Sequence, residues 1–80
     1  MFLEIVTPDK KIFSGEVKLA QLPGSHGSFE ILNNHAPIVS SLNKGKVRII
    51  DSEDKEFSFD IGGGVIESAD NKVIILAETV

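Results

Sequence analysis

Gly62-Gly63-Gly64 is the segment of this sequence whose residue types could most readily do chemistry. A glycine-rich loop can hold a phosphate when it leads from a strand into the N-terminus of a helix. Here the glycines lead into Val65-Ile66-Glu67, which has the composition of another strand. We therefore favour a tight bend or bulge between strands, or a place where another backbone approaches closely, over a nucleotide loop.

The histidines, His26 and His35, form the second group with possible chemistry. Glu30 lies between them, and imidazoles with a carboxylate are a ligand set that zinc uses. The alternative is that both are turn residues, because His26 lies in a Gly-Ser-His-Gly segment and His35 follows Asn33-Asn34. We favour the turn interpretation and expect no metal and no cofactor.

The serines show no catalytic pattern. The sequence contains no Gly-x-Ser-x-Gly segment, and carboxylates cluster only at Asp51-Ser52-Glu53-Asp54, which has the composition of a solvated turn. We therefore expect no catalytic residues. A protein without them works by binding partners.

Length and charge limit the kinds of partner. The 80 residues suffice for one small domain, so we expect a single domain over residues 1–80. With 12 acidic and 8 basic residues the net charge is -4, and the basic residues form no stripe that could follow a phosphate backbone. We expect no nucleic-acid partner. The absence of cysteine fits a reducing compartment, with the cytoplasm as the default.

Neither an export signal nor a membrane span is expected. The N-terminal apolar run is interrupted by Glu4, where an export signal would carry lysines. The longest purely apolar stretch, Val73-Ile74-Ile75-Leu76-Ala77, is far shorter than the roughly 20 residues of a membrane helix.

Short runs rich in Val, Ile and Phe alternate with Gly, Pro, Asn and Asp along the whole chain, and no segment has a helical period. This pattern predicts an all-β fold, a flattened antiparallel β-sandwich or barrel of about 8–10 short strands. The strands are expected at residues 2–6, 12–22, 28–32, 38–42, 46–50, 56–61, 65–68 and 73–78. Hairpin turns are expected at Asn43-Lys44-Gly45 and at residues 51–54.

Some apolar patterns also predict which way side chains point. Phe57, Phe59 and Ile61 alternate with polar residues and should face the core. The apolar phase slips between Leu19 and Ala20, which predicts a bulge or bend that lets one long strand serve two sheets.

The segment Val73-Ile74-Ile75-Leu76 is apolar on both faces, although only one face of a strand meets the core of a small sandwich. The other face either continues the core at an edge or forms a patch that a partner covers.

Six segments, taken in order and at near-constant spacing over the whole chain, resemble the epsilon subunit of the F-type ATP synthase. The step from His-Ala-Pro into an apolar strand and the step Gly-Gly-Val-Ile-Glu carry the most weight. The segments are Phe13-Ser14-Gly15-Glu16-Val17, Pro23-Gly24-Ser25-His26-Gly27, His35-Ala36-Pro37-Ile38-Val39, Gly45-Lys46-Val47-Arg48-Ile49, Gly63-Gly64-Val65-Ile66-Glu67 and Val73-Ile74-Ile75-Leu76-Ala77-Glu78-Thr79.

The resemblance implies a fold and a function. The family's N-terminal domain is a flattened β-sandwich at the foot of the central stalk, with one side against the gamma subunit and one end on the polar loops of the c-ring. This implies a non-catalytic rotor subunit of a proton-translocating enzyme, assembled with alpha and beta subunits on the cytoplasmic face of a bacterial inner membrane. It would dock gamma to the c-ring and transmit rotation for ATP synthesis. The residues alone also permit an unrelated small β-sandwich adaptor or ligand-binding module.

The resemblance also implies two sets of contact residues. We expect Ser28, Glu30 and His35 to lie together at one end of the sandwich. The residues implied to face the c-ring are Ser28, Phe29, Glu30 and His35. Those implied to face gamma are Thr7, Ser40 and Gly62.

This sequence departs from the family pattern in three places. Glu30 stands where relatives commonly have a small residue. Asn33-Asn34 stands where they often have Pro-Gly, and the turn should survive because Asn tolerates left-handed backbone. Most relatives continue into a two-helix hairpin that can inhibit ATP hydrolysis and, in some, bind ATP, whereas this sequence ends at Val80. We expect residues 1–80 neither to bind ATP nor to inhibit hydrolysis in that manner.

Overall fold

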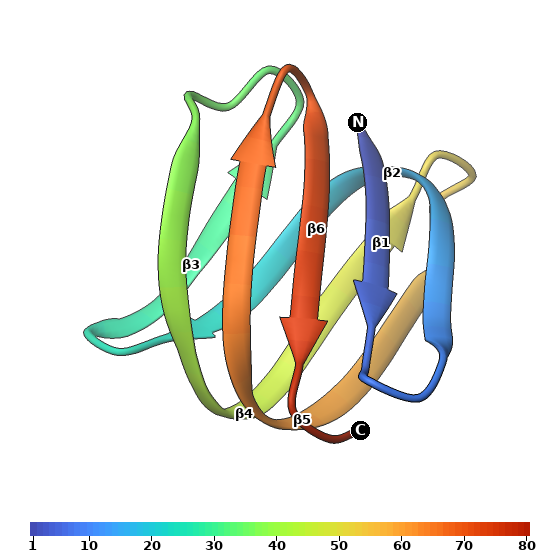
Figure 1. Ribbon diagram of the computed structural model, residues 1–80. Coiled ribbons are helices and arrows are strands. Elements are labelled where there is room, and N and C mark those ends of the chain that lie inside the picture. Colours follow the sequence, from blue (N-terminus) through green and yellow to red (C-terminus); the bar gives the residue numbers. More distant parts are fainter.

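Alternating apolar and polar residues place most of the chain in strands and none of it in a helix. The structure is a computed structural model that describes residues 1–80 (Figure 1). No helix is present that has the length and apolarity needed to cross a membrane. The strands are β1 (Phe2–Val6), β2 (Lys11–Gly24), β3 (Gly27–Leu32), β4 (Ile38–Asp51), β5 (Glu56–Ala69) and β6 (Lys72–Ala77).

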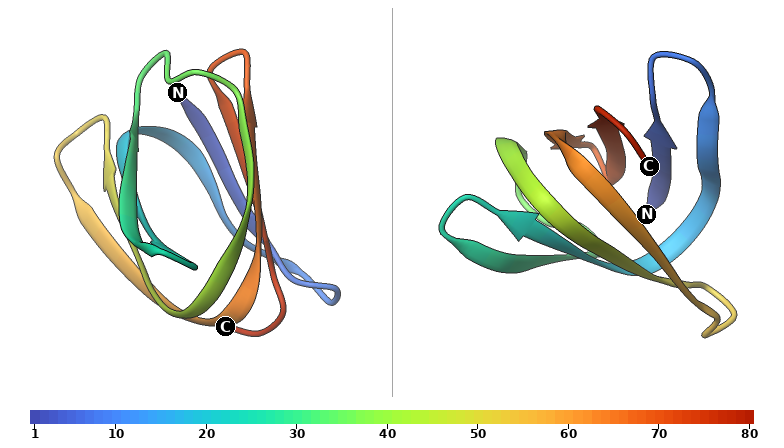
Figure 2. Two further views of the ribbon diagram at one scale, coloured as in Figure 1. Left: turned by 90° about the vertical axis from the view of Figure 1, so that its left-hand side faces the viewer. Right: turned by 90° about the horizontal axis from the view of Figure 1, so that it is seen from below.

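The strands form one sheet that closes on itself. Their order is β1-β6-β5-β4-β2-β3, and β1 also pairs with β2, so that every strand except β3 belongs to a closed ladder. The pairing of β1 with β6 is parallel and all the others are antiparallel. Because β2, β4 and β5 bend strongly, the closed ladder is flattened into two layers (Figure 2). The predicted all-β sandwich or barrel is confirmed.

The prediction that separate short strands lie on each side of Asn43-Lys44-Gly45 and of Gly62-Gly63-Gly64 is wrong. β4 and β5 each run through these segments without interruption, and they pair in the same register before and after them, from Ile38 with Ser68 to Ile50 with Glu56. The glycines remove the side chains that would resist a sharp bend, so the strands bend where the sequence suggested that they end. The hairpin turn expected over residues 51–54 is confirmed, and it joins β4 to β5.

Each long strand changes the face that it turns to the core. In each long strand, the sequence numbers of a buried residue before the bend and of a buried residue after it differ by an odd number. Because side chains on a strand alternate with a period of two, two such residues would point to opposite sides of a strand without a bend. The strand therefore leaves one layer and enters the other. In β2 the bulge falls between Val17 and Leu19 in the pairing with β4, which confirms the predicted bend. The buried pairs are Val17 and Ala20, Leu42 and Val47, and Ile61 and Ile66.

The glycine segment of β5 lies directly against β6 and the residues that follow it. A Cβ atom on Gly64 would overlap the carbonyl oxygen of Leu76 and would lie 3.1 Å from Ala77 Cα. Gly63 adopts a φ of 111°, a conformation that side chains disfavour. The chain after β6 stays on this segment through Glu78 N–H, which donates to Gly63 O at 3.0 Å. The predicted close approach of another backbone is confirmed.

Three aromatic rings lie along the open side between the two layers, which we call the aromatic seam. There, part of β2 and part of β5 each pair with a strand on one side only. The Phe13 ring lies 5.4 Å from that of Phe57 and 6.0 Å from that of Phe59, in tilted and edge arrangements that aromatic pairs prefer. As predicted, Phe57, Phe59 and Ile61 face inward. Ile61 is fully buried, whereas the two phenylalanines are half-buried against the core.

We expect Gly64→Ala to lower the free energy of unfolding by about 1–3 kcal/mol or more, because the backbone of β6 must move to admit the methyl group. That is a large part of the roughly 4–12 kcal/mol expected for a domain of this size. Gly15→Ala is the matched control, since its Cβ would meet only the Phe13 ring at 3.8 Å. Urea denaturation should show the control unchanged or slightly more stable, and equal losses in both variants would contradict the close approach.

Phe59→Ala should lower the free energy of unfolding by about 2–3 kcal/mol. The loss should not exceed the lower end of the roughly 3–5 kcal/mol typical of a fully buried phenylalanine, because the Phe59 ring is only half-buried. The same urea titration measures it. A midpoint equal to that of the unsubstituted chain would show that the aromatic seam contributes nothing.

Candidate functional site

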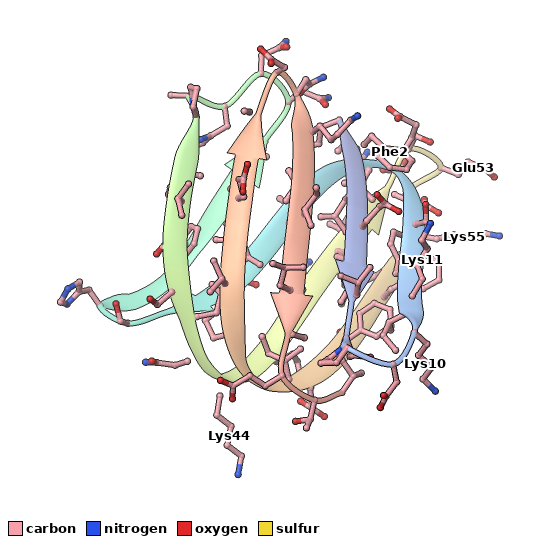
Figure 3. The ribbon with its side chains drawn as sticks, viewed as in Figure 1. Phe2, Lys10, Lys11, Lys44, Glu53 and Lys55 are labelled. Carbon is pink, nitrogen blue, oxygen red and sulfur yellow. The ribbon has the colours of Figure 1, made fainter.

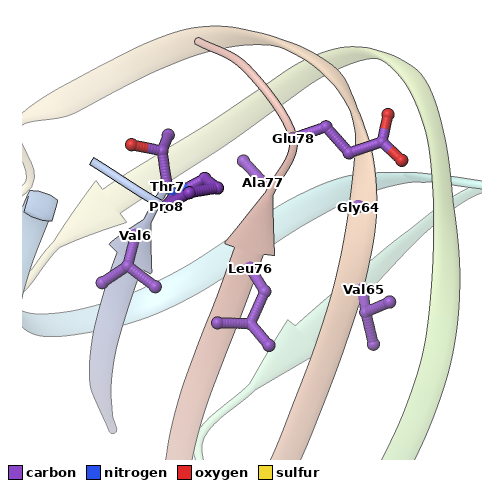
Figure 4. A pocket seen from close by; sticks show the side chains of 8 residues that line it. All are labelled: Val6, Thr7, Pro8, Gly64, Val65, Leu76, Ala77 and Glu78. Carbon is purple, nitrogen blue, oxygen red and sulfur yellow. The ribbon is translucent and has the colours of Figure 1, made fainter. Parts of the chain in front are cut away.

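The layer formed by β1, β6 and the bent-over halves of β5 and β4 carries an apolar row on its outer side. Val6 pairs with Leu76, and Leu76 pairs with Val65, so these side chains are neighbours on successive strands (Figure 4). Leu76 is 52% exposed and Val65 is 41% exposed. We call this surface the outer apolar face; its apolar residues are Phe2, Val6, Val39, Val65, Ile74 and Leu76.

The burial of the residues in β6 decides between the two interpretations of its second apolar side, which could either continue the core or form a patch that a partner covers. Val73 and Ile75 are fully buried, and Ile74 and Leu76 lie on the opposite side of β6. Leu76 does not continue the core. The outward residues instead belong to a patch that spans several strands, which favours the interpretation of a surface that a partner covers.

A hollow of about 400 Å³ opens at one end of the outer apolar face, beside the turn between β1 and β2 (Figure 4). The hydroxyl of Thr7 is occupied within that turn, because its Oγ1 accepts from Lys10 N–H at 3.3 Å. Glu78 is the only charged residue of the hollow. The hollow is lined by Val6, Thr7, Pro8, Gly64, Val65, Leu76, Ala77 and Glu78.

The charges around this face are mainly acidic. Glu4 is neutralised by Lys11, whose Nζ lies 2.8 Å from its carboxylate. Glu67 and Glu78 take part in no ion pair. The Glu78 carboxylate lies over Gly63, 3.4 Å from where a Cβ would be, at the edge of the hollow.

The outer side of the other layer is more polar. Its centre carries Arg48, whose Nη2 donates to Glu56 Oε1 at 3.1 Å. The hydrogen bond and charge of Glu56 raise the pKa of Arg48 above its usual value. Gln21 pairs with both Glu30 and Arg48, so a polar row crosses this layer.

Three of the labelled lysines lie on one side of the molecule, and the fourth lies by itself. Figure 3 shows Lys10 and Lys11 beside the β1–β2 turn, Lys55 at the β4–β5 turn and Lys44 alone at the opposite edge. The outer apolar face thus carries basic residues only on the side of β1, where Lys11 neutralises Glu4, and at the start of β6, where Lys72 pairs with Phe2, while Glu67 and Glu78 have no ion-pair partner.

Of the residues implied to face the c-ring, His35 lies apart from the three that are consecutive on β3. Ser28 is near the start of β3, whereas the backbone N–H of His35 donates to Leu32 O at the end of that strand. Leu32 is four residue steps along the extended strand from Ser28, a distance of roughly 13 Å. The expectation that Ser28, Glu30 and His35 share one end of the sandwich is wrong, because β3 runs its full length between them.

Phe29 packs partly against the core, and Ser28 and Glu30 are exposed. His35 is exposed in the turn after β3, where its ring Nδ1 lies 2.7 Å from Ala36 O. Asn34 adopts a φ of 62°, which confirms that asparagine supports this turn.

Of the residues implied to face gamma, Ser40 lies at a different hollow from Thr7, whereas Gly62 and Thr7 both lie beside Thr79. Thr7 lines the hollow on the outer apolar face, whereas Ser40 shares a second hollow of about 240 Å³ with Ser28 and Phe29. Gly62 is covered by the chain itself, since its N–H donates to the carbonyl oxygen of Thr79 at 3.1 Å. The contact roles of these residues stay predictions.

No metal centre is built from the histidines. His26 and His35 flank β3 at opposite ends with Glu30 between them, and no group of three or more His, Asp or Glu side chains is placed to hold an ion. The turn interpretation describes both histidines better.

The residues that sequence reasoning missed are Val39 and Val65. Both were assigned to strands without a face, yet Val39 is 72% exposed and pairs with Glu67 on the outer apolar face. For Val65, the sequence pattern did indicate an outward side chain or an outward neighbour, because Val65 and Ile66 are adjacent on a strand and only one of them can point to the core.

The whole chain matches one family of known proteins. Residues 1–80 match the family described as "ATP synthase, Delta/Epsilon chain, beta-sandwich domain". This chain belongs to the ATP synthase epsilon chain family. The epsilon chains of Chlorobaculum tepidum and Chlorobium limicola are 46% and 49% identical to it over 78 residues, covering 98% of this chain and 89% of each relative. The epsilon chain of Pelotomaculum thermopropionicum is 48% identical over 75 residues, which is 55% of that relative.

Solved structures agree with this assignment. A chain of the Euglena gracilis mitochondrial ATP synthase, in a structure of OSCP, F1 and c-ring, is 25% identical with a TM-score of 0.89, covering 98% of this chain and 51% of that one. The same fold is seen in a chain from a structure of the central stalk and c-ring of the Tetrahymena thermophila mitochondrial ATP synthase. That chain is 19% identical to this one with a TM-score of 0.81, and the match covers 96% of this chain and 62% of that one. As an epsilon chain, this protein is a non-catalytic rotor-stalk subunit of ATP synthase, a membrane-associated complex.

The turn at Asn34 gives a test of this region. We expect Asn34→Ala to lower the free energy of unfolding by about 1 kcal/mol, because alanine disfavours the left-handed backbone that Asn34 adopts. Asn34→Gly is the matched control and should be close to neutral, since glycine adopts this conformation freely. Thermal denaturation measures both, and an alanine variant as stable as the glycine variant would mean that the turn has another conformation.

Proposed function

We propose that this epsilon chain docks the gamma subunit to the c-ring and transmits rotation between them for ATP synthesis, as a single β-sandwich domain over residues 1–80. The observation that carries the proposal is the row of Val6, Leu76 and Val65 on the outer apolar face, in which Leu76 and Val65 are exposed and Val6 is half-buried. Exposed apolar patches of this kind mark surfaces that a partner protein covers. Membership of the epsilon family makes gamma the partner.

The hairpin between β2 and β3 is the part best suited to the polar loops of the c-ring. Its tip carries Ser25, His26 and Ser28, all exposed, and it projects away from the closed ladder. β3 pairs with β2 alone, so alternate residues of β3 direct their amide and carbonyl groups away from β2, toward whatever lies beside it.

The proposal includes a location and a coupling role. The subunit acts on the cytoplasmic face of a bacterial inner membrane, within a proton-translocating enzyme assembled with alpha and beta subunits. The similarity to epsilon chains of Chlorobaculum tepidum, Chlorobium limicola and Pelotomaculum thermopropionicum supports a bacterial enzyme. The alternative of an unrelated adaptor or ligand-binding module is set aside, because the family match covers residues 1–80.

Affinity purification of the tagged chain from its own organism tests the proposal. We expect alpha, beta and gamma subunits to be recovered together with it. Recovery of none of them, under conditions that preserve the enzyme, would overturn the assignment to the rotor.

Cysteine cross-linking tests how the subunit is mounted. In the assembled complex we expect Ser28→Cys to cross-link to a cysteine in the polar loop of the c subunit, because the β2–β3 hairpin is the end placed on the ring. Glu53→Cys, in the turn between β4 and β5, is the control and should not react. Since Ser28 and His35 lie at opposite ends of β3, His35→Cys forms a separate test. Cross-linking from position 53 instead would mean that the module is mounted the other way up.

A further inference from the structure

We infer that the hollow on the outer apolar face receives one large apolar side chain of the gamma subunit, and that a lysine or arginine next to that side chain pairs with Glu78. The inference rests on the proposed function and adds the chemistry by which gamma is recognised. It makes Leu76 and Glu78 the residues that decide affinity for gamma.

The shape of the surface supports an inserted side chain. The hollow is an open depression with a volume of about 400 Å³. Apolar side chains from three separate segments converge on it, namely Val6 and Pro8, Val65, and Leu76 (Figure 4). Gly64 adds backbone without a side chain, so nothing from this position fills the space.

The position of the hollow supports a protein as its occupant. The hollow is the end of an apolar surface that extends through Val65 and Leu76 toward Ile74 and Val39 on neighbouring strands. A small molecule in the hollow would leave that surface in water, whereas a partner protein with one inserted side chain would cover both. Large apolar or aromatic side chains that enter pockets and lose their contact with water commonly dominate the affinity of an interface.

The charges define what should stand next to the inserted side chain. The backbone of Glu78 is fixed by a hydrogen bond, in which its N–H donates to Gly63 O at 3.0 Å. The Glu78 carboxylate forms no ion pair within this chain. Glu67 is also without an ion pair, and Glu4 is already neutralised by Lys11. A basic residue of gamma would therefore find an unpaired carboxylate at the edge of the hollow.

The affinity of the purified chain for its cognate gamma subunit, measured by isothermal titration calorimetry, tests the role of Leu76. Leu76→Ser should weaken binding by about 30-fold or more, the effect of losing a dominant interface residue. Leu32→Ser is the matched control, because Leu32 is 53% exposed against 52% for Leu76 and lies on β3, away from the outer apolar face. The control should bind within about twofold of the unsubstituted chain.

Glu78→Gln tests the charge. We expect binding to weaken by about two- to fivefold, and the salt dependence of the affinity to become shallower, because one exposed ion pair is lost. Thermal denaturation of each variant checks that the fold is retained. The substituted side chains are exposed, so the fold should persist.

The outcomes separate this inference from the proposed function. If the unsubstituted chain does not bind gamma at all, the proposed function fails. If it binds gamma but Leu76→Ser and Glu78→Gln bind as tightly as Leu32→Ser, the proposed function stands and this inference is overturned. Native mass spectrometry that finds a small molecule bound to the purified chain, and lost in Leu76→Ser, would also overturn it.

Discussion

The contact between the backbones of β5 and β6 at Gly64 is the constraint on which the rest of this structure depends. No side chain fits between Gly64 and the carbonyl oxygen of Leu76, and Gly63 next to it has a φ of 111°. The bend in β5 and the close course of β6 require each other. Because β6 is held there, Leu76 points away from the core beside Val65, and Glu78 follows at the edge of the hollow. The outer apolar face is a consequence of how the core is closed.

The same bends explain how a short chain supplies two different outer faces. Each of the three long strands turns one set of apolar residues inward in the first layer and the alternate set inward in the second, with a change of phase at the bend. One strand therefore contributes to both layers without a connecting loop. The outer residues are then free to differ, with Arg48 and Glu56 paired on one side and Leu76 and Val65 exposed on the other.

The sequence predicted the elements of this fold better than their continuity. Alternation alone identified the strand with Phe57, Phe59 and Ile61, and the phase slip near Leu19 identified the bend in β2. Glycine is compatible with a turn and with a bent strand, so composition could not show that β4 and β5 continue. The surface was harder still. The family resemblance implied contact residues but not their separation along β3, and only the register of β6 with β1 and β5 shows that Leu76 and not Ile75 faces outward.

The closed ladder also suits a subunit that transmits torque. β1, β6, β5, β4 and β2 are joined in a ring of paired strands, so relative movement of any two of them must break hydrogen bonds elsewhere in the ring. In the proposed function the load enters through the β2–β3 hairpin and leaves through the outer apolar face. β2 connects these regions directly, because one end pairs with β3, its middle with β4, and its other end with β1. A single continuous strand therefore links the β2–β3 hairpin to β1, at one edge of the layer that carries the outer apolar face, and the bend within it is fixed by pairing on either side.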